Sequence, residues 1–195
     1  MKRLLVLAVV AAFAQAGCAG GPKRSTTLTD ASPTATTRSS EVVRIDPILL
    51  RALRAPASSP KIAVLKLWAL GQVGAGPSVA AVYDPAVRRE VGAATLAAAA
   101  IYQRPTYLEA TPKLVSISPS RMGALVVISV SGHFESFLLR RRSAIWTILF
   151  DTVMDRALWG YATSQASGAA KGRLQAERLS RAFRSASEVP RVTKR

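Results

Sequence analysis

The chain has 195 residues, of which 27 are lysine or arginine and 11 are aspartate or glutamate, so its formal net charge is +16. A single cysteine excludes an internal disulfide. The chain also has only one histidine, so it offers too few ligands for a zinc site. A basic balance of this size usually indicates a nucleic-acid partner, but the N-terminal residues have the pattern of an export signal, so we expect no nucleic acid.

Residues 1–17 have the layout of a signal peptide. A short basic start is followed by eleven apolar residues, 4–14, which Gln15 and Gly17 bring to an end. A membrane-spanning helix needs roughly 20 apolar residues, so this stretch is too short to span. We therefore expect residues 1–17 to direct export and to be removed.

Two small residues, Ala16 and Gly17, precede Cys18, and this arrangement resembles the lipobox of bacterial lipoproteins. Gln15 departs from the family pattern, which usually has leucine there. The resemblance implies that Cys18 carries the lipid attachment; the alternative is an incidental cysteine near an ordinary cleavage site. If the resemblance extends to sorting, Ala19 implies the periplasmic side of the outer membrane.

Residues 18–40 are rich in Ser, Thr, Ala and Gly, with Leu28 as the one large apolar side chain. Such a segment cannot bury enough surface to order its backbone, so we expect a disordered tether with a reach of about 25 Å. The remaining residues, 41–195, are enough for one domain with its own core, ending in a basic helix and tail.

The first half of this domain mixes helix and strand patterns. Asp46 before Pro47 is typical of a helix N-terminus and predicts a helix over 46–54. The apolar run 62–70 favours a central strand, and 78–83 favours a second one. Asp84 before Pro85 predicts a long helix to residue 102. Its expected inward face is Val87, Val91, Ala94, Ala98, Ile101 and Tyr102.

The second half predicts further strands at 114–118, 124–131, 144–150 and 157–163, the last two paired as a hairpin through a turn at 151–156. Residues 169–187 predict a basic helix whose inward residues are Ala170, Leu174, Ala182, Phe183 and Ala186. The whole pattern predicts an α/β fold: a single domain with a mixed sheet of five or six strands and helices packed on it.

Three consecutive arginines interrupt an apolar run and predict the tip of a hairpin. As a hypothesis, this tip and the C-terminal helix form an electropositive surface for an anionic lipid or cell-wall partner. The residues concerned are Arg140, Arg141, Arg142, Arg173, Arg178 and Arg181. The alternatives are a solvated turn and an arginine-rich composition without a binding role.

Residue patterns that resemble catalytic motifs lack the side chains that the corresponding mechanisms require. Residues 71–78 have the glycine spacing of a phosphate-binding loop, but Pro77 occupies the position where that loop requires lysine. We predict that His133 and Glu135 lie in a surface turn and that Asp151 and Asp155 are turn residues. We therefore expect a non-enzymatic protein with no catalytic residues, no metal and no cofactor.

Several short segments are similar, in their order, to bacterial lipoproteins related to the curli secretion channel and to activators of penicillin-binding proteins. They are 61–65, 122–127, 146–151 and 157–159, and the similarity extends over roughly 61–190. The turn after Asp151 lacks the glycine usual in those families.

From export, the anchor and the missing chemistry we expect a periplasmic lipoprotein that supports an envelope assembly by binding an envelope protein. The resemblance implies two alternatives, an oligomeric secretion-channel component and an activator of cell-wall synthesis. The oligomeric state is left open.

Overall fold

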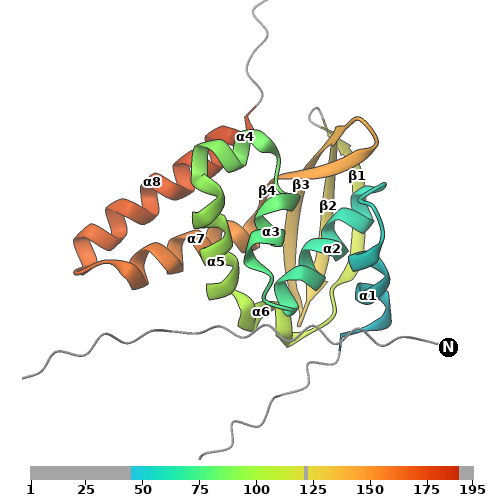
Figure 1. The fold of residues 1–195 in the computed structure, drawn as a ribbon, viewed down its shortest axis with the longest axis horizontal. Coiled ribbons are helices and arrows are strands. Elements are labelled where there is room, and N and C mark those ends of the chain that lie inside the picture. Colours follow the sequence, from blue (N-terminus) through green and yellow to red (C-terminus); the bar gives the residue numbers. More distant parts are fainter. Residues whose placement is uncertain (1–44, 121–122, 189–195) are drawn as a thin grey trace, which may run out of the picture. The chain divides into compact units, whose positions relative to one another are not determined.

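A computed structural model describes residues 45–120 and 123–188. The predicted signal peptide, Cys18 and tether, and the C-terminal tail, lie outside these residues. The described part is an α/β domain with a four-stranded antiparallel sheet (Figure 1). Its helices are α1 (Pro47–Arg54), α2 (Pro60–Gln72), α3 (Gly76–Val82), α4 (Pro85–Val87), η1 (Arg88–Gly92), α5 (Ala93–Tyr102), α6 (Arg104–Glu109), α7 (Thr152–Gln165) and α8 (Ala169–Ser187).

The strands are β1 (Lys113–Ser120), β2 (Gly123–Val130), β3 (His133–Arg142) and β4 (Ile145–Asp151), and they lie in the order of the sequence. Three predicted strands are confirmed as β1, β2 and β4, and β3 fills the stretch between them. The prediction of five or six strands in a mixed sheet was wrong, because the described sheet has four strands and every neighbouring pair is antiparallel.

The apolar runs 62–70 and 78–83, predicted as strands, lie in α2 and, apart from Tyr83, in α3. The Ser59 hydroxyl accepts a hydrogen bond from the Ile62 N–H at 3.3 Å, and Pro60 opens the first turn of α2. Every residue of α2 from 67 to 72 is buried, so its apolar positions show no helical period. A helix enclosed in this way has the same sequence pattern as a buried strand.

The long helix predicted after Asp84 is confirmed, but it contains the π-helical turn η1. A π turn is wider than an α turn and shifts every later residue around the helix. The buried positions therefore pass from Val87 and Val91 to Leu96, Ala99 and Ala100. The predicted inward face was wrong at Ala94, Ile101 and Tyr102, which are exposed.

The predicted hairpin through residues 151–156 was also wrong, because 157–163 belongs to α7. The Asp151 carboxylate accepts a hydrogen bond from the Met154 N–H at 2.6 Å and caps this helix. An N-cap and a turn use the same aspartate chemistry, which explains the error.

Helix α8 confirms the predicted C-terminal helix and packs against α7 (Figure 1). The two helices approach closely at Gly172, where a Cβ atom would lie 3.1 Å from the Thr163 Cα. Phe183 is buried as predicted, but Ala170 and Leu174 are exposed, contrary to the prediction.

The core lies between the sheet and the helices, with α2 at its centre. Trp68 of α2 is fully buried, and its indole N–H donates to the carbonyls of Tyr107 and Ala110, both at 3.1 Å. From the sheet, Val126 and Phe137 pack into the same cluster. Helix α2 contacts β1, β2 and β4 on one face of the sheet, and α1 and α3 pack against α2 (Figure 1).

Candidate partner-binding surface

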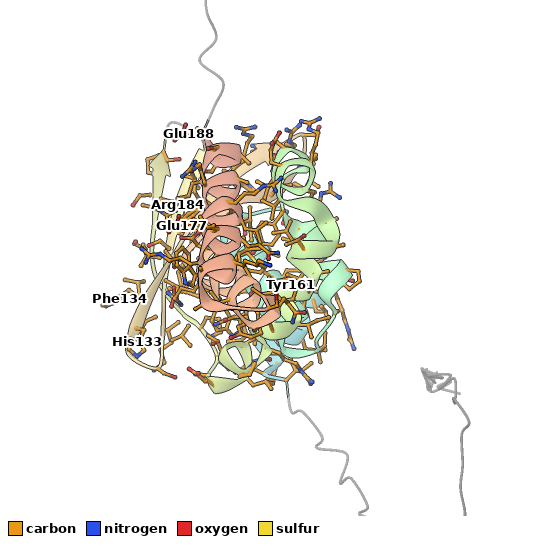
Figure 2. All side chains as sticks on the ribbon, turned by 90° about the vertical axis from the view of Figure 1, so that its left-hand side faces the viewer. His133, Phe134, Tyr161, Glu177, Arg184 and Glu188 are labelled. Carbon is orange, nitrogen blue, oxygen red and sulfur yellow. The ribbon has the colours of Figure 1, made fainter. Side chains whose placement is uncertain are left out.

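The other face of the sheet carries no described helix over β1, β2 and β3 (Figure 2). Buried and less buried residues alternate along β2 and β3, so the less buried set points away from the core. The strand register arranges this set in three rows: Ser118, Leu125 and Leu138; Ser116, Val127 and Ser136; Lys113, Ser129 and Phe134. We call these nine residues the open face.

The open face is apolar and hydroxyl-bearing, with a charge only at its margins. Leu125 is 38% exposed and Phe134 is 70% exposed, and serines separate the apolar side chains. Lys113 lies in the outermost row, and Arg140 follows the face on β3. In a chain of net charge +16, this uncharged centre is distinctive. Depletion of charge together with apolar and aromatic groups is typical of the core of a protein interface.

The edge strand β1 is less suited to contact than the face. It has Lys113 at its start, a bulge at Val115 and Pro119 near its end. Each of these features discourages another strand from adding to an edge. The candidate contact surface is therefore the open face.

The predicted arginine tip is confirmed as the end of the β3–β4 hairpin. Arg141 is exposed, but the Arg142 Nε and Nη2 atoms donate to the two carboxylate oxygens of Asp84 at 2.7 and 3.1 Å. The sequence predicted Asp84 only as a helix cap and missed this long-range contact.

Asp84 is fully buried and has four donors around its carboxylate. Besides Arg142, it accepts from the Ala86 N–H at 3.0 Å and from the Thr147 hydroxyl at 3.2 Å. Burial alone would raise the pKa of Asp84, but these hydrogen bonds and the charge of Arg142 lower it below its usual value. Arg142 is thus the counter-ion of a buried carboxylate.

The six predicted arginines do not converge on one site. Arg173 pairs with Glu177 on the exposed side of α8, and Arg178 and Arg181 are exposed on the same helix. Arg140 and Arg142 instead line a cavity of about 500 Å³ with Ser185, near the other end of α8. Ser185 lies twelve positions after Arg173, which is ~18 Å along a helix at 1.5 Å per residue.

A second buried carboxylate lies where β4 passes into α7. The Tyr83 hydroxyl donates to Asp151 at 2.7 Å, and both side chains are fully buried. Burial raises the pKa of Asp151 to about 6, although hydrogen bonds from Tyr83 and Met154 oppose the shift. Burial is also the main reason that the pKa of Tyr83 is raised well above its usual value.

The prediction of a surface turn at residues 133–135 was wrong for Glu135. His133 is exposed as expected, but Glu135 is buried in β3. Its carboxylate pairs with Arg156 and accepts a hydrogen bond from the Thr152 hydroxyl, both from α7. Glu135 therefore fastens α7 to the sheet.

No family model, no curated protein and no solved structure matches this chain. Within residues 45–120 and 123–188, no three His, Cys, Asp or Glu side chains are placed to hold a metal ion. No helix in that part is long and apolar enough to cross a membrane.

Replacing Arg142 by Gln should lower the free energy of unfolding by about 1–2 kcal/mol, because the buried Asp84 loses its charged partner. Arg141→Gln removes the same charge from the neighbouring exposed position and should change that energy by less than about 0.5 kcal/mol. Chemical denaturation at pH 7 measures both. Equal effects would show that Asp84 does not depend on Arg142.

The buried Asp151 should make the domain less stable as pH rises. Its folded pKa of about 6 lies above the usual 3.8, so its contribution is fully present below pH 3.8 and is lost as pH rises through 6. The loss is about 3 kcal/mol by the linkage relation. Asp151→Asn should remove this component of the pH dependence.

Denaturation curves at several pH values between 4 and 7 measure that difference. Asp46→Asn is a matched control, because it removes a carboxylate from another helix N-cap in a partly exposed position. If Asp151→Asn kept the wild-type slope, the assigned pKa would be wrong.

Proposed function

We propose that this chain is a non-enzymatic lipoprotein, anchored through Cys18 on the periplasmic side of the outer membrane. It supports an envelope assembly by binding a protein partner through the open face. The observation that carries the proposal is the uncharged centre of this face in a strongly basic chain.

The chemistry of the open face favours a protein over a lipid bilayer. Serines alternate with its apolar residues, and a hydroxyl transferred into hydrocarbon without a hydrogen bond is costly. The peptide groups and polar side chains of a protein offer the hydrogen bonds that Ser116, Ser129 and Ser136 need.

The proposed lipid anchor at Cys18 determines where the domain is located. A single acyl chain binds a membrane only marginally, whereas the several chains typical of bacterial lipoproteins bind stably. Residues 18–40, as a flexible tether, would keep the domain within about 25 Å of its membrane. Partners on the same membrane surface are therefore favoured over distant ones.

Labelling cells with radioactive palmitate tests the anchor. We expect label on the wild-type chain in the outer-membrane fraction and none on Cys18→Ala. Label on neither chain would overturn the anchor and the proposed location, while leaving the open face to be judged separately.

A photo-crosslinking amino acid at Phe134 tests the contact. We expect an adduct of one defined mass with another protein, lost when Leu125→Lys places a charge in the open face. The same probe at Leu174, which is 67% exposed on α8, is the control and should give no such adduct. An adduct of two copies would favour the oligomeric alternative, and none would overturn the contact.

A further inference from the structure

A groove of about 430 Å³ lies between α2, α3 and β4, on the helix-covered side of the sheet. Figure 1 shows α2 and α3 next to each other. It shares no residue with the open face, and it involves none of the arginines predicted to bind an anion.

The groove is mainly apolar. Leu70 of α2, Val82 of α3, and Ile145 and Trp146 of β4 form its walls. Ile145 is 47% exposed, so this end of β4 is open to solvent. An apolar cleft with a few convergent polar groups is the usual form of a small-molecule site.

Lys66 is the one charged residue among those that line the groove. Its ammonium donates to the Ala55 carbonyl at 2.8 Å, which fixes the position of the side chain. An ammonium has three N–H donors, so two others are available to a ligand. Among the described carboxylates, none forms an ion pair with Lys66.

The ligand that fits this arrangement has an apolar body and one anionic end. A peptide in the groove would also bury backbone N–H and C=O groups, each of which needs a partner. The lining offers few such partners: the Thr147 hydroxyl already bonds Asp84 and the Arg140 carbonyl, which leaves the Ser78 hydroxyl beside Lys66. An acyl chain has no backbone groups to satisfy.

We propose that this groove binds a single-chain amphiphile with an anionic head, such as the carboxylate of a long-chain fatty acid. The acyl chain lies along Leu70, Val82 and Trp146, and the carboxylate accepts hydrogen bonds from the Lys66 ammonium. This site does not rest on the lipid anchor or on the open face.

Fluorescence of cis-parinaric acid, an 18-carbon fatty acid, tests the site on the full chain carrying Cys18→Ala. We expect saturable binding that palmitate displaces. Ala81 is exposed and lines the groove, so Ala81→Trp should fill it and abolish binding. Ala93→Trp, at an exposed position of α5 outside the groove, should bind as before.

Lys66→Gln tests the head group, since its amide removes the charge and keeps a hydrogen-bond donor. We expect the affinity for palmitate to fall about tenfold, as for the loss of one charge-assisted hydrogen bond. The affinity for hexadecanol, which has no charge, should stay within about twofold. Circular dichroism confirms that each variant folds.

Failure of parinarate to bind, or unchanged binding to Ala81→Trp, would overturn the site. Equal loss of palmitate and hexadecanol in Lys66→Gln would overturn the assigned role of the ammonium. The readouts are independent of palmitate labelling and crosslinking, so this proposal and the proposed function fail separately.

Discussion

The junction at Tyr83 and Asp84 connects the helical layer to the sheet. The Asp84 N–H donates to the Ile148 carbonyl at 2.8 Å, and the Asp84 carboxylate holds Arg142 and Thr147 of the hairpin. Tyr83 reaches the other end of β4 through its bond to Asp151. Since both carboxylates are fully buried, each depends on its hydrogen-bond donors, and the domain depends on the contacts that supply them.

This junction decides which parts of the sheet are left for other contacts. Phe183 of α8 packs its ring against Tyr83 and Phe150, at 5.9 and 5.1 Å between centroids, and so covers the β4 side. The opposite edge, β1, has a lysine, a bulge and a proline, which discourage strand addition. The other face of β1 to β3 carries no described helix, and it is the surface that the proposed partner would contact.

The sequence predicted the elements that have local signals and failed where the cause was tertiary. The aspartate-proline caps placed the starts of α1 and α4 correctly, and the strands predicted at 124–131 and 144–150 are β2 and β4. The burial of α2 on all sides erased its helical period, although Ser59 and Pro60 carried a cap signal that could have identified it. No local sequence signal predicts the π turn η1 or the pairing of Arg142 with Asp84 across 58 positions.

The sequence did not predict the candidate partner-binding surface either. The open face depends on which side of each strand the helices cover, and this follows from strand register and from α2, which was read as a strand. The apolar groove combines residues of α2, α3 and β4 for the same reason. The arginine tip, by contrast, was predictable because three adjacent charges between apolar runs cannot be buried together.

Three ion pairs give arginines of this basic chain a structural role. Asp84, Glu135 and Asp155 have side chains that are 0%, 6% and 15% exposed, and each pairs with an arginine that is about half exposed or more. These arginines compensate buried carboxylates that fasten the hairpin, α7 and α8, and their charge is not free to attract a distant anion. Each pair also contains one carboxylate, so the net charge of +16 is carried by the remaining basic residues. The centre of the open face carries no charge, so the proposed contact with a partner depends on its apolar and hydroxyl groups rather than on the net charge.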